Sequence, residues 1–155
     1  MITPALKVSH LSKRVQGLPQ IIDVSFEVFP GEIYGLLGVQ GAGKSMLLRI
    51  LVSLAHANYG SIEVFGERLT PENPGVLSQV GCLLNPPGFY ETMSIRDNLE
   101  IQVAYTGLHD PRRVGEVLKL FELEREAHIK LRNIPEPKRQ LIALARAIIH
   151  RPRLL

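Results

Sequence analysis

Residues 33–54 read IYGLLGVQGAGKSMLLRILVSL, and this stretch decides the fold. Its centre, residues 38–45, matches the phosphate-binding loop pattern G-x-x-x-x-G-K-[ST] at every specified position. Glycines let such a loop curl so that successive backbone N–H groups point inward around phosphate oxygens. The apolar run before the loop predicts a buried strand over residues 33–37. The leucines after it predict a helix over residues 44–54 with an apolar face that consists of Leu47, Leu48, Leu51 and Leu54.

The loop and the start of this helix are predicted to hold a chain of phosphates and a magnesium ion. The helix directs its N-terminal dipole and its first N–H groups at the same anion. Lys44 is expected to reach the β- and γ-phosphates, and the Ser45 hydroxyl to ligate Mg²⁺. The alternative is a glycine-rich turn between strand and helix with a lysine in solvent. The predicted binding residues are Gly38, Val39, Gln40, Gly41, Ala42, Gly43, Lys44, Ser45 and Met46, with Ser45 as the metal ligand.

The remaining segments indicate an α/β fold. Strands are predicted at residues 5–8, 21–28, 62–64 and 80–84, the last of them buried. Ser94 with Asp97 three residues later is a capping box and predicts a helix that runs to about Tyr105. A further helix is expected after Asp110 and Pro111, and a last one over residues 138–150, after Pro135 and Pro137 break the chain.

Composition excludes several other classes of protein. The 155 residues are 45% hydrophobic and 21% charged, as in a globular domain with a sizeable core. The longest apolar stretch, residues 47–55, contains Arg49 and Ser53, so no membrane-spanning helix is expected. The single cysteine, Cys82, excludes an internal disulfide and a cysteine-based zinc site, and it favours the cytosol. The basic residues after position 111 follow helical patterns without aromatic neighbours, which indicates a solvated face and no nucleic-acid partner.

The surroundings of the loop resemble the ATP-binding subunits of ABC transporters, especially drug- and bacteriocin-export relatives. Residues 11–45 resemble the N-terminal stretch that ends in the Walker A loop, and residues 59–69 (YGSIEVFGERL) resemble the strand and turn that follow the Walker A helix. Residues 80–100 (VGCLLNPPGFYETMSIRDNLE) resemble the segment around the Q-loop. Residues 139–155 (RQLIALARAIIHRPRLL) resemble the helix after the signature motif. The four matches follow the order and spacing of the family.

This resemblance implies the architecture, the ligands and the partners. The fold would be an ABC-type P-loop NTPase with an N-terminal antiparallel β part and a helical subdomain. Residues 1–155 would form one nucleotide-binding domain: the β part and P-loop core in 1–84, the Q-loop and helical subdomain in 85–133, and a degenerate signature with its following helix in 134–155. ATP and Mg²⁺ would bind. A transmembrane subunit, facing loop 86–93 and helix 94–105, and a second nucleotide-binding subunit would be partners on the cytoplasmic face of the cell membrane.

Three positions depart from the family's pattern. Val15 stands where members usually place an aromatic that stacks on adenine, and it offers only van der Waals contact. Asn85, counted among the nucleotide-binding residues, stands at the Q-loop glutamine, and its amide is one methylene shorter. Residues 134–138 align with the signature motif LSGGQ but read IPEPK. Pro135 and Pro137 have no N–H to donate to a phosphate.

The Walker B segment would begin at about Leu154, so its Asp and Glu, and the switch histidine after them, are expected beyond residue 155. The resemblance therefore implies a chain cut before Walker B, without the central strands, whose segments 33–37 and 80–84 expose apolar edges. Two functions stay open. One is the ATPase subunit of an exporter, and the other is a nucleotide-binding module that does not hydrolyse ATP. A small-molecule kinase would need an arginine-rich lid, and residues 55–66 contain no arginine.

Overall fold

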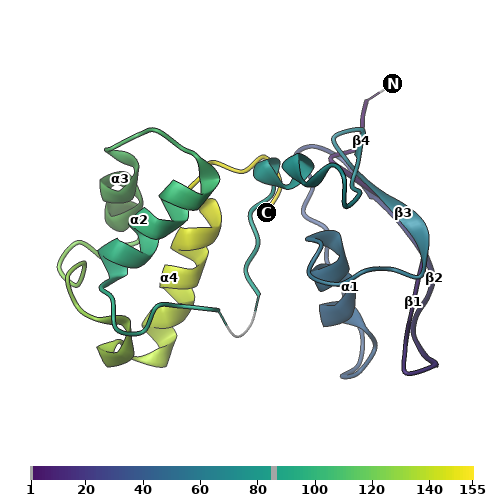
Figure 1. The fold of residues 1–155 in the computed structure, drawn as a ribbon, viewed down its shortest axis with the longest axis horizontal. Coiled ribbons are helices and arrows are strands. Elements are labelled where there is room, and N and C mark those ends of the chain that lie inside the picture. Colours follow the sequence, from purple (N-terminus) through teal and green to yellow (C-terminus); the bar gives the residue numbers. More distant parts are fainter. Residues whose placement is uncertain (1, 85–86) are drawn as a thin grey trace. The chain divides into compact units, whose positions relative to one another are not determined.

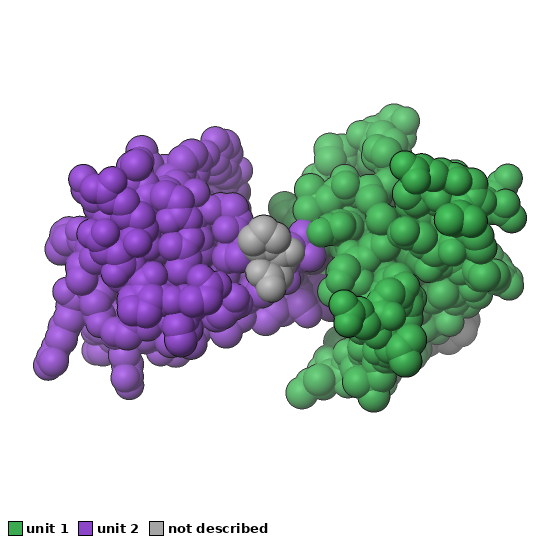
Figure 2. Space-filling model, turned by 90° about the horizontal axis from the view of Figure 1, so that it is seen from below, with its two compact units in different colours: residues 1–78 green, residues 79–155 purple. Residues whose placement is uncertain are grey.

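The chain folds into two compact units, residues 1–78 and 79–155, as Figure 2 shows in green and purple. The structure is a computed structural model, and it describes residues 2–84 and 87–155. Each unit has a core of its own. That the whole chain acts as one nucleotide-binding domain therefore stays a prediction. Across the described residues, no helix combines the length and apolar character that a bilayer crossing requires.

Unit 1 is built on a four-stranded antiparallel sheet with the order β2-β1-β3-β4 (Figure 1). The strands are β1 (Leu6–Val15), β2 (Leu18–Val28), β3 (Tyr59–Val64) and β4 (Glu67–Arg68). Apolar side chains of the first three strands form the core of this unit: Leu6, Val8, Leu11, Ile21, Val28, Ile62 and Val64. The strands predicted at 5–8, 21–28 and 62–64 are confirmed, and the pairing extends each of them.

Helix α1 (Lys44–Leu51) begins at the end of the glycine-rich loop and contacts β2. Leu47 and Ile50 are buried, whereas Leu48 and Leu54 are exposed. The predicted apolar face is therefore wrong at Leu48 and Leu54. The helix ends at Leu51, so Leu54 lies beyond it, and the direction in which α1 meets the sheet selects Leu47 and Ile50.

The buried strand predicted over residues 33–37 is not formed. The backbone there belongs to no sheet, and Ile33 and Leu37 are 101% and 93% exposed. A parallel strand needs neighbours on both sides and covering layers, and no described residue pairs with this segment. The exposed apolar edge that the family resemblance implies is confirmed here.

Unit 2 is a helical cluster. The 3-10 turn Pro74–Gln79 spans the boundary between the two units in sequence. Unit 2 itself contains α2 (Ile95–Thr106), α3 (Arg113–Leu120), α4 (Glu136–Ile148) and the short 3-10 turn Leu131–Asn133. Its core is formed by Ile95, Leu99, Val117, Leu118, Leu123, Leu131, Ile142 and Ile149.

The three predicted helices of unit 2 are confirmed, and α3 and α4 begin at other residues than predicted. The backbone N–H of Arg112 donates to the Asp110 carboxylate, 3.1 Å away, so α3 begins after this turn. Helix α4 begins two residues before the predicted start. Pro135 is its N-cap and Pro137 lies in its first turn, where a missing N–H breaks no helical hydrogen bond.

The strand predicted over residues 80–84 is formed only at its start. Val80 makes a parallel bridge to Leu154, and the N–H of Gly81 donates to the Leu154 carbonyl at 2.8 Å. Cys82 and Leu83 are exposed. Here too the segment lacks the further neighbours that a buried parallel strand requires.

Candidate functional site

The glycine-rich loop connects the exposed segment 33–37 to α1. Gly41 and Gly43 both have a φ of 85°, in the left-handed region that favours glycine. The N–H of Ala42 donates to the Val39 carbonyl at 3.2 Å, which closes a turn within the loop. Because two residues have positive φ in so short a stretch, the loop curls as a phosphate-binding loop does.

Lys44 folds its side chain back over this loop. Its Nζ donates to the carbonyl oxygens of Gly38 at 2.6 Å and Val39 at 2.8 Å. These bonds hold the Lys44 amine against the first residues of the loop. A positive charge in that position fits the oxygens of a phosphate chain.

The N-terminus of α1 is open to a ligand. Gly43 is its N-cap, and no side chain caps the helix. The first N–H groups of a helix have no partner within it, so those of the first turn of α1 fit an anion. Ser45, in this turn, is exposed. The described residues contain no cluster of three or more His, Cys, Asp or Glu side chains that would hold a metal ion. The Ser45 hydroxyl remains the predicted magnesium ligand.

Close packing against β2 fixes the position of the loop. A Cβ on Gly43 would overlap the backbone carbonyl oxygen of Gln20 and would lie 3.4 Å from the Ile21 side chain. Figure 1 shows α1 beside the hairpin of β1 and β2. Sequence reasoning found the loop and missed this contact, because the pattern G-K-[ST] carries no information about which strand the second glycine meets.

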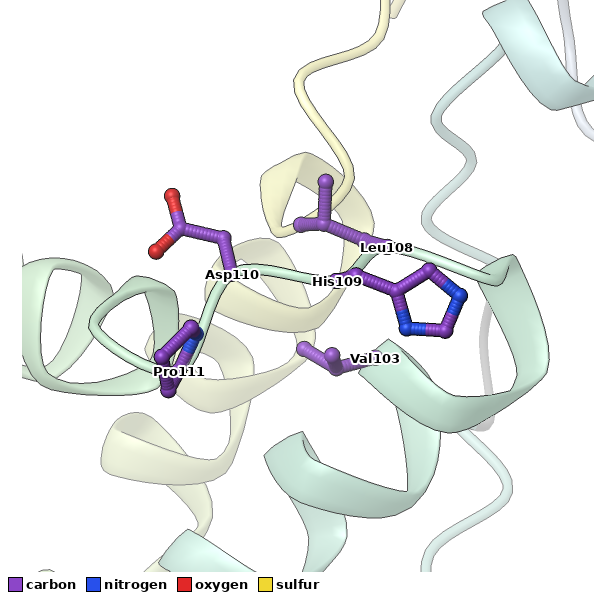
Figure 3. Close-up of a pocket in the computed structure, with 5 residues that line it drawn as sticks. All are labelled: Val103, Leu108, His109, Asp110 and Pro111. Atoms are coloured by element: carbon purple, nitrogen blue, oxygen red, sulfur yellow. The ribbon is translucent and has the colours of Figure 1, made fainter.

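A separate pocket of about 330 Å³ lies at the C-terminal end of α2 (Figure 3). In Figure 3 the His109 ring and the Asp110 carboxylate point in different directions. Asp110 accepts hydrogen bonds from the Arg112 N–H and from Arg151, which hold the pKa of its carboxyl below the usual value. No polar groups converge in this pocket, so the loop is the better candidate. The pocket is lined by Val103, Leu108, His109, Asp110 and Pro111.

Comparison with known proteins decides the family. The sequence profile described as "ABC transporter" matches residues 21–155. The chain belongs to the ABC transporter family. A solved structure titled "Structure of ATP binding subunit of ABC transporter" superimposes with a TM-score of 0.86 at 27% identity, over 96% of this chain and 63% of that chain.

Two bacterial members of the ABC family are similar at 32% identity. One is the uncharacterized ABC transporter ATP-binding protein YcbN of Bacillus subtilis, matched over 99% of this chain and 50% of the relative. The other is the bacitracin transport ATP-binding protein BcrA of Bacillus licheniformis, matched over 97% and 49%. The chain thus spans about half the length of the curated relatives that it matches. The resemblance to this family is confirmed, and its relatives include a bacitracin transport protein, in line with the predicted likeness to drug- and bacteriocin-export members.

Val15 and Asn85 are the two positions outside the loop where the family's pattern predicts contact with the nucleotide. Val15 is half-buried and lies at the tip of the β1–β2 hairpin, where it pairs with Leu18. Asn85 lies outside the described residues, so its role stays a prediction. The roles of the loop residues also stay predictions, because no ligand is bound to them.

The start of α4, where the sequence predicts a degenerate signature motif, presents few donors. Pro135 and Pro137 have no N–H, and the N–H groups of Lys138 and Arg139 both donate to the Pro135 carbonyl, at 3.0 and 3.2 Å. The Glu136 carboxylate lies in this first turn, 3.5 Å from the Arg139 guanidinium. A negative charge and missing donors make this helix start a poor phosphate contact.

The loop after residue 86, which faces the membrane subunit in the ABC family, is anchored on α4. Phe89 contacts two guanidinium groups two helical turns apart, with 5.7 Å from its ring centroid to Arg139 Cζ and 4.8 Å to Arg146 Cζ. Arg146 also donates to the Gly88 carbonyl. Burial lowers the pKa of Arg146. The neighbouring Tyr90 stays exposed and its hydroxyl lies 3.5 Å from that of Tyr105.

Proposed function

We propose that this chain binds Mg-ATP through residues 38–46 and is the nucleotide-binding part of an ABC transporter subunit that powers export. One observation carries the proposal: the Lys44 amine is hydrogen-bonded to a loop in which Gly41 and Gly43 have positive φ, directly before a helix N-terminus without a side-chain cap. Each part of this arrangement suits phosphate, and the three occur together in a member of the ABC family.

Each residue has a stated role in the proposal. Backbone N–H groups of Gly41, Gly43 and the first turn of α1 surround the phosphate oxygens. Lys44 exchanges its carbonyl partners for the β- and γ-phosphates, and the Ser45 hydroxyl ligates Mg²⁺. The magnesium ion held there would supply positive charge that offsets the charge of the phosphates. Asn85 would be the residue at the Q-loop position.

The names of relatives support a role in transport. Besides BcrA, a Nod factor export ATP-binding protein of Burkholderia thailandensis is 30% identical over the whole of this chain. By that analogy the chain would work with a transmembrane subunit and a second nucleotide-binding subunit at the cytoplasmic face of the membrane. The loop anchored through Phe89, with Tyr90 and Tyr105 exposed beside it, supports a docking role for this surface.

A second function is favoured by the start of α4. A subunit that contributes Pro135, Glu136 and Pro137 to a partner's γ-phosphate would stabilise charge poorly during hydrolysis. In this alternative the chain binds nucleotide without turning it over. The two functions share the same binding loop and differ in ATP hydrolysis.

Binding of Mg-ATP by the purified chain, measured by isothermal titration calorimetry, tests the proposal. The wild type is expected to bind, and Lys44→Ala is expected to weaken binding by about 10²-fold, because a charge-assisted contact is worth about 1.5–3 kcal/mol or more beside phosphate. Lys119→Ala, a change of an exposed lysine in α3, is the matched control and should bind as the wild type does.

Equal affinity in the wild type and in Lys44→Ala would reject binding through this loop. Phosphate release from Mg-ATP then separates the two functions. Turnover that Lys44→Ala abolishes favours the ATPase, and binding without turnover in a chain that includes the predicted Walker B segment favours the non-hydrolysing module.

A further inference from the structure

We propose that this site recognises the Mg-bound triphosphate group with little regard to the base, so that GTP and inorganic tripolyphosphate bind nearly as tightly as ATP. The inference rests on the proposed function and adds the class of ligand: any nucleoside triphosphate, or the triphosphate chain alone. It follows from the residues that lie beside the loop, where a base joined to the bound phosphates would have to be held.

The structure locates these residues through Gly43. Its contacts with the Gln20 carbonyl and the Ile21 side chain bring the start of β2 against the loop. The strand pair Val15–Leu18 closes the hairpin immediately before this point. We therefore take the hairpin tip and the first residues of β2, residues 15–22, as the part of the sheet that a base joined to the phosphates would meet.

Residues 15–22 have side chains that are aliphatic or neutral and polar. They read VQGLPQII, with no aromatic ring and no charged side chain. Leu18 is 71% exposed and Val15 is half-buried, so these two residues present an aliphatic surface to a bound base. Such a surface contacts any flat base by van der Waals forces and gains little from one base over another. The amides of Gln16 and Gln20 both donate and accept hydrogen bonds, so they suit the edges of adenine and guanine alike.

Unit 1 has five aromatic residues, none of them within residues 15–22. Phe26 and Tyr34 are stacked on each other, with ring centroids 4.8 Å apart and planes 11° apart. Phe29 and Phe65 are half-buried. Tyr59 is the most exposed of the five, at 73%, and pairs with Ser12, three residues before Val15 on β1. The experiment therefore tests Tyr59 by substitution.

The groups of this site that can bind a charged ligand, in contrast, all lie where the phosphates are predicted. The Lys44 amine and the N–H groups at the start of α1 lie in the loop itself. Affinity at this site is therefore expected to come from the phosphate chain, and removing the base should change it little.

A ligand series on the wild-type chain tests the inference by calorimetry: Mg-ATP, Mg-GTP, Mg-CTP and Mg-tripolyphosphate at one ionic strength. Stacking of a base on an aromatic side chain is worth about five- to 150-fold in affinity. Without it, the four dissociation constants are expected to agree within about fivefold. If Mg-ATP binds more than about tenfold tighter than Mg-tripolyphosphate, the base contributes to affinity and the inference is refuted. The proposed function would be unaffected by that result.

Variants make the test independent of absolute affinity. Val15→Tyr should tighten the three nucleotides by about fivefold or more and leave tripolyphosphate unchanged, whereas Val15→Leu should change none of them. Tyr59→Ala should also change none, and a loss for nucleotides alone would identify Tyr59 as a base platform and refute the inference. If none of the four ligands binds, the proposed function itself fails.

Discussion

Gly43 joins the phosphate-binding loop to the sheet. Its φ of 85° and the close approach of the Gln20 carbonyl both exclude a side chain at this position. The pattern of the loop predicts a glycine here because the backbone N–H groups must turn toward the phosphates. The structure adds a second reason, since the same residue sets where the loop lies on β2.

Replacement of Gly43 by alanine should therefore harm both folding and binding. We expect Gly43→Ala to lower the free energy of unfolding of unit 1 by about 1–3 kcal/mol and to weaken Mg-ATP binding. Gly35→Ala is the control in the same unit, because a Cβ at Gly35 meets no atom within 4 Å. Urea unfolding of the two variants gives the comparison, and equal stability would contradict the packing role of Gly43.

Lys44 and Ser45 could be located from the sequence, because the pattern fixes their spacing to the glycines and requires no knowledge of the rest of the fold. Gln20 could not, since it acts through its backbone carbonyl. Arg113 could not be recognised as a cap of α4 either, because its partners are distant in sequence. Its guanidinium donates to the carbonyls of Ile148 and Ile149, 35 and 36 residues away in sequence, at 2.9 and 2.7 Å.

Helix α2 begins with a complete capping box. The N–H of Asp97 donates to Ser94 Oγ at 3.1 Å, and the N–H of Ser94 donates to the Asp97 carboxylate at 2.9 Å. The Ser94 hydroxyl donates to the same carboxylate at 2.7 Å. These bonds from the Ser94 side chain and backbone hold the pKa of Asp97 below its usual range. This element was predicted from two residues, because both members of the box are local in sequence.

The capping box makes the stability of unit 2 depend on pH. The carboxyl has a lower pKa folded than unfolded, so its stabilisation is complete above the ordinary Asp value of about 4 and is lost as the pH falls through the folded value. We expect Asp97→Asn to flatten the fall in unfolding free energy below about pH 4, relative to wild type, in urea titrations from pH 7 to 2.5. Ser94→Ala should cost about 1 kcal/mol at pH 7. Parallel pH profiles for wild type and Asp97→Asn would contradict this role.

Elements that depend on distant neighbours were harder to predict than capped helices. Residues 33–37 have the composition of a buried strand, yet a parallel strand forms only beside partners, and Ile33 and Leu37 are exposed here. The bends of β1 and β2 also escaped prediction. His10 and Asp23 have φ of 51° and 48°, and the His10 ring lies 2.7 Å from the Asp23 carboxylate across the two strands. Neither residue type signals such a bend by itself.

At the scale of the molecule, the phosphate-binding loop and the surface expected to meet the membrane subunit belong to different units. The loop and α1 lie in residues 1–78, and Phe89, Tyr90 and α2 lie in residues 79–155. Ligand binding at the loop should therefore be detected locally in unit 1. A measurement resolved along the chain is more informative than a single melting temperature.

Hydrogen exchange with and without saturating Mg-ATP, followed by mass spectrometry of peptides, tests phosphate binding at this loop most directly. We predict slower exchange in peptides that cover residues 38–51, no change in peptides of α2 and α3, and no protection anywhere in Lys44→Ala. Unchanged exchange over residues 38–51 at saturating Mg-ATP, or the same protection in Lys44→Ala as in wild type, would contradict a nucleotide site at this loop.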